Sequence, residues 1–212
     1  MNYRQSLITA AILLLFALIG TAMVAYTYDS TRERIAANER ATLLRKLHRL
    51  IPPESHDNAL LQDTLQVQNE TLLGTADPVT VYRARMHGKP VALVIAAVAP
   101  DGYSGAIRLL VGINVDGSLS GVRVVAHRET PGLGDGIEED RSDWILGFTG
   151  KSLQNPTLQG WAVKKDGGVF DQLTGATITP RAVVKAVRQA LLYYQHHKDA
   201  LFAPGETTSS HE

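Results

Sequence analysis

Residues 107–129 read "IRLLVGINVDGSLSGVRVVAHRE" and indicate the fold class. In the first half of this stretch, apolar side chains alternate with other residues, which is the two-residue period of a half-buried strand. Asp116-Gly117 comes next, a dipeptide that commonly forms the turn of a β-hairpin. Residues 120–129 then return to a strand pattern, so the stretch predicts two antiparallel strands joined by a tight turn.

A second pair of strands precedes this hairpin. "VTVYRARM" (79–86) and "PVALVIAAVA" (90–99) are rich in β-branched and apolar residues and flank the turn His87-Gly88-Lys89. Two hairpins in succession, with no crossover helix between them, favour an antiparallel sheet over a parallel one.

The last long segment, residues 179–197, reads "TPRAVVKAVRQALLYYQHH" and predicts a helix. Its apolar residues share one helical face, and Thr179 and Pro180 are expected as the N-cap and the first turn. We therefore predict an α+β fold, a twisted antiparallel sheet with packed helices. Between sheet and helix, we expect a short helix capped by Ser142 and a further hairpin in residues 160–170.

The N-terminal region contains 22 residues without a charge, from Leu7 to Tyr28. A helix of that length reaches roughly 33 Å, enough to cross a hydrocarbon core of about 30 Å. The apolar run continues past Gly20 and Ala22, the small residues at which a signal peptide could be cut. We therefore expect a retained transmembrane helix rather than a cleaved signal.

The charges around this span do not fix its orientation, because Arg4 precedes it while Arg32 and Arg34 follow it. A very short N-terminal tail usually stays in the cytoplasm, which would leave the remainder outside. The expected organisation is a cytoplasmic tail, a transmembrane helix, a helical stalk, an extracytoplasmic domain and a C-terminal tail, at 1–6, 7–28, 29–53, 54–204 and 205–212.

The composition excludes several classes of function. With 21 basic and 21 acidic residues, the chain lacks the charge of a nucleic-acid-binding protein. It has no cysteine, which excludes disulfides, thiol nucleophiles and iron–sulfur clusters. The seven histidines lack metal-ligand spacing, and "GLGDG" (132–136) lacks the spacing of a dinucleotide fingerprint. We expect no metal and no nicotinamide, so any electrons must come from another protein.

Two glycine-bearing stretches remain as candidates for a binding site. "RETPGLGDG" (128–136) allows a flat ligand to approach the backbone closely, or it is simply a long turn. "DQLTGATITP" (171–180) gathers three hydroxyls at a helix start, where N–H groups and the helix dipole favour a phosphate. Alternatively, these threonines only form a turn and cap the helix.

The segment "DQLTGAT" (171–177) resembles the flavinylation motif D-x-x-[ST]-G-A-[TS] at every defined position. That motif belongs to the FMN-binding domain of the G subunit of the Rnf (Rsx) ion-translocating electron transport complex. The domain also occurs in the C subunit of the sodium-pumping NADH:quinone oxidoreductase. The anchor, the stalk, "RETPGLGD" and the Trp144 region extend the resemblance over most of the chain, whose size is closer to the Rnf subunit.

The resemblance implies a covalent cofactor. In the family, a flavin transferase moves FMN from FAD onto the last threonine of the motif, here Thr177, as a phosphoester. The flavin domain lies outside the cytoplasm, on the bacterial inner membrane, where a covalent bond keeps the flavin from being lost. Thr177 is therefore expected to carry the phosphoryl group, with Asp171, Thr174, Gly175 and Ala176 shaping the site.

Glu129, Thr130, Leu133 and Gly134 are expected to line the flavin ring, whereas Trp144 either stacks on it or belongs to the core. The predicted function is that of a single-span, electron-carrying subunit, not an enzyme on its own. Its expected partners are the other subunits of the complex, the flavin transferase and membrane lipid. Two alternatives remain: a structural anchor subunit, and an extracytoplasmic module that binds a phosphate-bearing ligand without a covalent bond.

Overall fold

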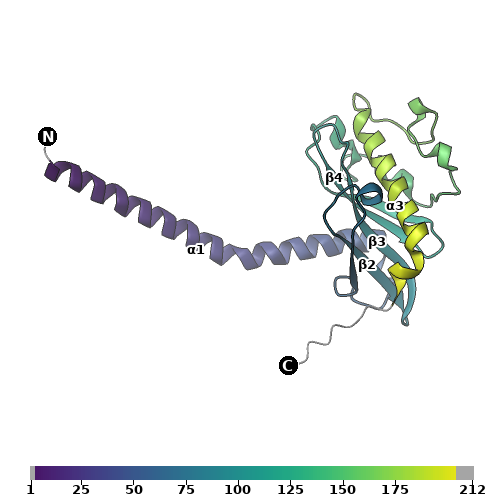
Figure 1. Cartoon of the computed structure of the whole chain (residues 1–212), viewed down its shortest axis with the longest axis horizontal. Helices are drawn as coiled ribbons and strands as arrows, with labels where there is room; N and C mark the ends of the chain where they lie inside the picture. The colour runs from purple at the N-terminus through teal and green to yellow at the C-terminus, as the bar shows by residue number, and fades with distance from the viewer. Residues whose placement is uncertain (1–2, 204–212) are drawn as a thin grey trace. The chain divides into compact units, whose positions relative to one another are not determined.

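The computed structural model describes residues 3–203, and the chain divides into two units between Arg45 and Lys46. Helix α1 (Tyr3–Leu50) runs without a break through the predicted membrane segment and most of the predicted stalk (Figure 1). Residues 1–2 and the predicted C-terminal tail lie outside the described residues.

The first unit contains α1 as far as Arg45, and the apolar side chains of its predicted membrane segment are exposed. Leu7 and Phe16 are each 70 % exposed, and Met23 is 71 % exposed. Water-soluble surfaces rarely carry a contiguous apolar patch of this size. Helix α1 is long and apolar enough to cross a membrane, in agreement with the sequence prediction.

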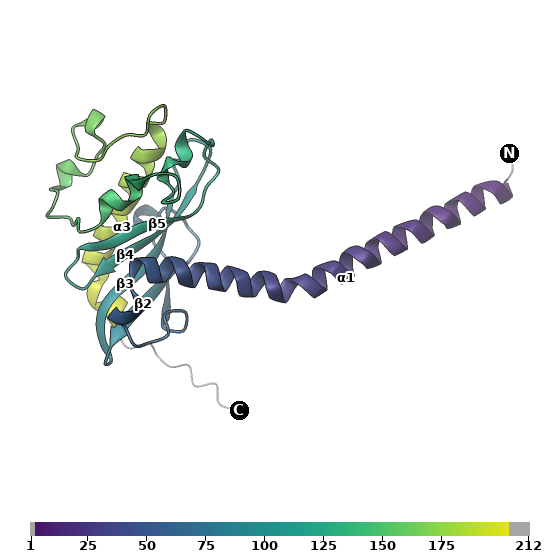
Figure 2. The same cartoon turned by 180° about the vertical axis from the view of Figure 1, so that it is seen from behind.

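The second unit is built on a five-stranded antiparallel sheet in which each strand pairs with its neighbours in the sequence (Figure 2). Both predicted hairpins are present, and Gly117 in the second turn has a φ of +88°, which favours glycine. The first strand was not predicted. The strands are β1 (Thr64–Val67), β2 (Val79–Met86), β3 (Lys89–Ala99), β4 (Ile107–Asn114) and β5 (Leu119–Ala126).

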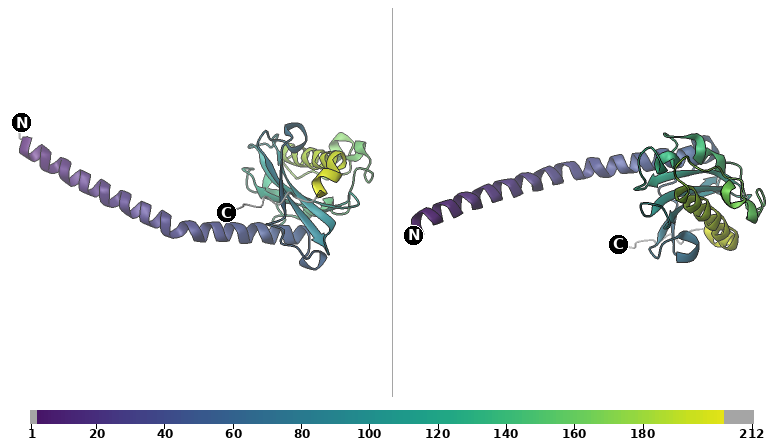
Figure 3. Two further views of the ribbon diagram at one scale, coloured as in Figure 1. Left: turned by 60° about the horizontal axis from the view of Figure 1, so that its bottom comes forward. Right: turned by 90° about the horizontal axis from the view of Figure 1, so that it is seen from above.

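Helix α3 (Ile178–Phe202) covers one face of the sheet and lies alongside β3 and β4 (Figures 1 and 3). Val183 and Val187, one helical turn apart, belong to the same buried cluster as Leu109 and Val111 of β4. The two strand residues are two positions apart and therefore face the same side of the sheet. The apolar stripe of the helix and the alternating pattern of the strand thus form one core.

The opposite face of the sheet is covered by the last turn of α1, which belongs to the second unit. Leu47 and Leu50 are buried there. A Cβ atom added at Gly112 of β4 would lie 2.3 Å from Ser120 Oγ of β5 and 3.2 Å from the Leu50 Cβ, so a side chain there would crowd both the neighbouring strand and the helix. Lys46 Nζ also donates to the Val124 carbonyl of β5 at 2.7 Å.

The outer edge of β5 is bound by a later segment of the chain. Leu119 N–H donates to the Lys151 carbonyl at 2.7 Å, and Gly150 N–H donates to the Leu119 carbonyl at 2.8 Å. These bonds continue the hydrogen-bonding pattern of the strand for one residue pair, so the edge of β5 is partly covered.

The connection from β5 to α3 contains short helices around an aromatic cluster, in which Phe148 stacks on Phe170 with ring centroids 4.6 Å apart. Ser142 Oγ accepts from Trp144 N–H at 3.2 Å and caps η3, as predicted. The remaining elements are η1 (Pro53–Ser55), α2 (Glu70–Leu73), η2 (Gly134–Ile137), η3 (Asp143–Phe148), η4 (Leu158–Gly160) and η5 (Lys164–Asp166).

The predicted hairpin in residues 160–170 is wrong. The segment forms the short helix η5, and Val163 and Phe170 pair only in an isolated parallel bridge. Gly167 was expected in a hairpin turn, but its left-handed backbone ends η5 instead, where its N–H donates to the Lys164 carbonyl. A glycine with a left-handed backbone can either end a helix or form a hairpin turn, and the neighbouring residues do not show which of the two occurs.

Candidate functional site

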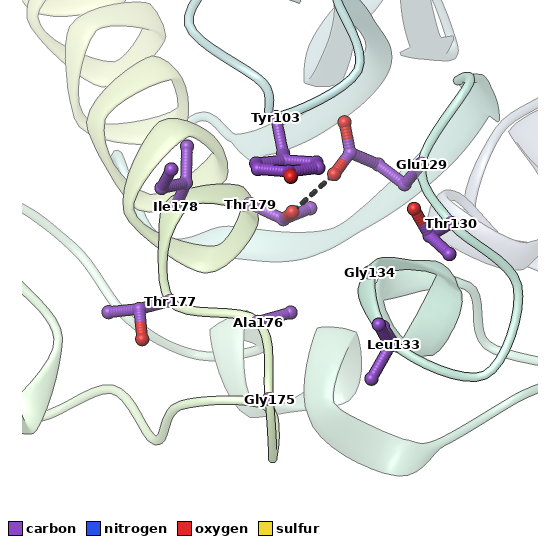
Figure 4. A pocket seen from close by; sticks show the side chains of 10 residues that line it. All are labelled: Tyr103, Glu129, Thr130, Leu133, Gly134, Gly175, Ala176, Thr177, Ile178 and Thr179. Atoms are coloured by element: carbon purple, nitrogen blue, oxygen red, sulfur yellow. Dashed lines mark hydrogen bonds between the residues drawn. The ribbon is translucent and has the colours of Figure 1, made fainter.

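A pocket of about 340 Å³ lies where the first turn of α3 meets the loop after β5. This volume is near the lower end of the range for small-molecule sites. We call residues 129–138 the pocket loop. The pocket is lined by Tyr103, Glu129, Thr130, Leu133, Gly134, Gly175, Ala176, Thr177, Ile178 and Thr179 (Figure 4).

The structure therefore brings together seven of the nine predicted site residues, from two separate stretches. Thr174 and Asp171 do not line the pocket. Thr174 is exposed in a turn, and Asp171 is exposed and paired with Lys164. The Asp171 carbonyl accepts from Trp144 Nε1 at 2.7 Å, so this residue holds the segment before the pocket instead of lining it.

Trp144 belongs to the edge of the core. It packs against the buried cluster and meets Phe148 edge to face, with centroids 5.4 Å apart. Its indole N–H is bound to the Asp171 carbonyl, and it does not line the pocket. Of the two interpretations of this residue from the sequence, the core residue is the one observed.

Helix α3 begins earlier than predicted, because its N-cap is Thr177 and not Thr179. Pro180 suggested a first helical position, but proline is tolerated throughout the first turn, where backbone N–H groups have no intrahelical partner. Thr177 has helical backbone angles (φ −98°, ψ −32°) and makes no side-chain capping hydrogen bond. Its half-buried hydroxyl is therefore not used to cap the helix.

Thr179 instead holds the pocket loop to the helix. It is 1 % exposed, and its hydroxyl donates to the Glu129 carboxylate. Figure 4 shows the Thr179 side chain directed toward Glu129, whereas the Thr177 side chain points away from it. The two threonines, although only two positions apart, thus serve different purposes.

Glu129 is only 4 % exposed, which is unusual for a carboxylate. One carboxylate oxygen accepts from Ser104 N–H at 3.0 Å, and the other accepts from the Thr179 hydroxyl. Both oxygens are satisfied by hydrogen bonds, as burial of a carboxylate requires.

Two glycines let the backbone come close to this carboxylate and to the pocket. A Cβ atom at Gly134 would lie 2.8 Å from Glu129 Oε2 and 3.1 Å from Thr179 Oγ1. Gly175 has a φ of +78°, in a turn closed by the bond from Ala176 N–H to the Leu173 carbonyl at 3.1 Å. A side chain at either position would obstruct the place where the two stretches meet.

The rim of the pocket is apolar and exposed. Tyr103 is 69 % exposed, and Leu133 and Ile178 are each 46 % exposed. They come from three different segments and surround a polar interior formed by Glu129 and Thr179. An arrangement of this kind suits a flat, largely apolar ligand with a few polar groups.

The first turn of α3 provides the positive end of a helix dipole beside the pocket, with N–H groups that have no partner inside the helix. Such an end binds anions, and phosphates in particular. Arg181, in the same turn, is paired with Asp166 through two bonds of 2.6 Å, and this contact lowers the pKa of the Asp166 carboxyl. Its charge is therefore already engaged.

Three of the residues that line the pocket were not predicted from the sequence: Tyr103, Ile178 and Thr179. Tyr103 lies between β3 and β4, and no periodic pattern indicates where a loop residue will lie. Ile178 and Thr179 were expected to belong to the helix start, and only the position of α3 relative to the sheet brings them to the pocket loop.

The model of the FMN-binding domain matches residues 102–192, and the model of the RnfG N-terminal region matches residues 1–50. The G subunit of the ion-translocating oxidoreductase complex from Pseudomonas aeruginosa (strain UCBPP-PA14) is 52 % identical over 210 residues, which cover 99 % of this chain and 98 % of the relative.

Two further relatives carry the same name. The protein of Pseudoalteromonas atlantica is 52 % identical over 192 residues, which cover 91 % of this chain and 89 % of the relative. The protein of Shewanella oneidensis is 50 % identical over 192 residues, which cover 91 % of both chains.

The pocket, its helix end and the matched domain model define an FMN-binding-domain protein with an N-terminal helix that can cross a membrane. The relatives match this chain over more than 90 % of its length at 52 % sequence identity. This chain belongs to the family of G subunits of the ion-translocating oxidoreductase complex.

The close approach at Gly134 yields a prediction. Gly134→Ala should destabilise the protein by about 1–3 kcal/mol, because the added methyl group overpacks against Glu129 and Thr179. The measurement is urea unfolding of the full-length chain in detergent, followed by tryptophan fluorescence. Gly147→Ala is the matched control, since its added methyl group meets no atom within 4 Å. Equal unfolding midpoints for the two variants would contradict the close packing.

Proposed function

We propose that this chain carries FMN as a phosphoester on the Thr177 hydroxyl and passes electrons between neighbouring subunits of a membrane complex. The observation that carries the proposal is the position of Thr177. It is the last residue of the complete "DQLTGAT" motif, it is the N-cap of a long helix, and it lines the pocket. Its hydroxyl makes no capping bond.

The residues around Thr177 fit a phosphate. A phosphoryl group on its oxygen would lie at the N-terminal end of α3, where the dipole and the first N–H groups stabilise negative charge. Gly175 and Ala176, just before it in the pocket wall, leave room because their side chains are absent or small. These residues would leave space for the phosphate at the helix end.

The remainder of the pocket fits a flat ring. Leu133, Ile178 and Tyr103 offer exposed apolar and aromatic surface at its rim. Burying such surface against a ring contributes roughly 25 cal/mol per Å². Thr130 adds a hydroxyl to the lining of the pocket loop. We infer that these residues orient the ring while leaving one side open to a partner.

Glu129 would set the electrostatic environment of the ring. FMN held here would supply electron transfer, and a nearby carboxylate would oppose the addition of negative charge to it. Because the Glu129 side chain is held at both oxygens, its charge is fixed in place. The chain's contribution is thus to position the cofactor and to lower its potential.

The family's name supports the wider assignment. Relatives at about 50 % identity carry the name of the G subunit of an ion-translocating oxidoreductase complex. We infer that this chain assembles with the other subunits of such a complex, and that a flavin transferase loads it. We further infer that α1 lies among the lipids of the bacterial inner membrane, with the domain on the extracytoplasmic side. A covalent bond would there prevent loss of a flavin that cannot be replaced.

Two other functions are possible for the same fold. One is a structural anchor subunit, in which the pocket is empty. The other is a module that binds a phosphate-bearing ligand without a covalent bond. Flavin that stays on the chain through denaturation excludes both, because the first carries no ligand and the second releases it.

Thr177→Val should abolish covalent flavin. Valine keeps the β-branched shape but lacks the oxygen that forms the ester, so the fold should be retained. The measurement is flavin fluorescence of the full-length chain in a denaturing gel under ultraviolet light, after co-expression with a flavin transferase. Thr174→Val, at the exposed turn of the same motif, is the matched control and should stay fluorescent. The reverse result would assign the bond to Thr174.

Glu129→Gln should raise the midpoint potential of the bound flavin. A unit charge several ångströms away at an effective dielectric of about 20 contributes roughly 2 kcal/mol, or about 40 mV for a two-electron couple. The amide can still accept from Ser104, and the Thr179 hydroxyl can rotate to accept from it. A redox titration at equal flavin loading makes the measurement, with Glu70→Gln, at an exposed position of α2, as control. An unchanged potential would remove Glu129 from the flavin environment.

Alkaline phosphatase joined after residue 203 should be active, because the enzyme folds only outside the cytoplasm and we expect the domain to lie there. The same reporter joined after residue 6, before the apolar segment, should be inactive and serves as control. Activity near background in the first fusion would reverse the orientation, and with it the reason given for covalent attachment.

A further inference from the structure

The backbone of Glu129 is held by a side chain that does not line the pocket. Glu129 N–H donates to Nδ1 of His127 at 3.0 Å. His127 follows directly after the end of β5 at Ala126, so it extends from the rigid sheet. Its side chain is only 10 % exposed.

The other ring nitrogen of His127 contacts the far end of the pocket loop. Nε2 lies 2.8 Å from Oε1 of Glu138. Glu129 is the first residue of the pocket loop and Glu138 is the last, so one imidazole ring connects the two ends. The pocket residues Thr130, Leu133 and Gly134 lie between these two attachment points.

The two contacts determine where the proton of the ring is. A backbone N–H can only donate, so Nδ1 must accept and carries no proton. A carboxylate accepts, so Nε2 carries the proton and donates it to Glu138. The neutral Nε2–H tautomer satisfies both contacts. In the other neutral tautomer, the Nδ1–H of His127 would face the backbone N–H of Glu129, and neither group could accept a hydrogen bond.

Charged groups of the surrounding elements hold Glu139, the neighbour of Glu138, in place. Arg123 of β5 and Arg49 of α1 both pair with Glu139, at 2.9 and 2.7 Å. Burial lowers the pKa of Lys46, and the negative charge of Glu138 partly opposes this shift. The Glu138 carbonyl also accepts from Arg141 N–H at 3.0 Å and from Ser142 N–H at 3.1 Å, so this end of the pocket loop has contacts besides the one with His127.

We propose that His127, as its Nε2–H tautomer, is a positioning residue that fixes the pocket loop and thereby the Glu129 carboxylate. Nδ1 aligns the backbone of Glu129, and the bonds from Ser104 and Thr179 then hold its side chain. The effect on a flavin rests on the proposed function, whereas the effect on the loop does not. A residue that merely filled space would act through its volume and not through Nδ1.

Two substitutions distinguish the contribution of Nδ1 from that of Nε2. In His127→Asn, Oδ1 takes the position of Nδ1 and can accept from the N–H two residues on, as asparagine commonly does. In His127→Gln, the amide reaches the position of Nε2 and can donate to Glu138, but no acceptor remains at the position of Nδ1. The first variant should therefore preserve the loop, and the second should release it.

The first test uses the full-length chain in detergent without flavin, so it does not depend on the proposed function. Nitrogen NMR of isotope-labelled histidine should show an unprotonated Nδ1 and a protonated Nε2 at His127. Amide hydrogen exchange at Glu129 should be about fivefold to tenfold faster in His127→Gln, the factor expected for one ordinary hydrogen bond. In His127→Asn it should stay at the wild-type rate. Protonated Nδ1 in wild type, or equal exchange in the two variants, overturns the proposal.

The second test uses the flavin-loaded chain. The potential of His127→Gln should move toward that of Glu129→Gln, while His127→Asn keeps the wild-type potential. If wild type carries no flavin, the proposed function fails and the first test alone decides the role of His127. If both variants shift the potential equally, the volume of the ring matters and Nδ1 does not, which overturns the proposal.

Discussion

The buried carboxylate of Glu129 is the point at which three distant segments meet. It accepts from Ser104 between β3 and β4, and from Thr179 in the first turn of α3. An uncompensated carboxylate in this position would cost several kcal/mol, so each of its partners is required. The same requirement explains the glycine at 134, because any side chain there would displace the carboxylate from its donors.

Much of the fold could be predicted because it follows from local patterns. The alternation in β4 and the Asp116-Gly117 turn specified one hairpin, and His87-Gly88 specified the other. Strand β1 and helix α2 were not predicted, because each has only four residues. A periodic pattern of apolar residues cannot be recognised over so short a segment. The hairpin predicted around Asp166-Gly167 failed because a left-handed glycine ends a short helix as readily as it turns a strand.

The lining of the candidate pocket was predictable in part. Thr177 and the pocket loop were identified because a motif and a glycine-bearing stretch are visible in one dimension, and the structure brings them to one pocket. Tyr103 was not identified, because its contribution arises only from packing between segments. Asp171 belongs to the same motif, yet its contacts are with Lys164 and Trp144 outside the pocket. A sequence motif does not separate residues that touch a ligand from those that hold the segment carrying them.

The covered edge of β5 has a consequence for solubility. An open sheet exposes unpaired N–H and C=O groups at its outer strands, where other chains can add and aggregate. In the part of the chain that the structure describes, the edge strand β1 is only four residues long. At the other edge, the backbone of Leu119 in β5 is hydrogen-bonded to Gly150 and Lys151, and the Val124 carbonyl accepts from Lys46. Neither edge offers a long, flat template for strand addition, so neighbouring copies concentrated on one membrane can stay apart without a separate protective element.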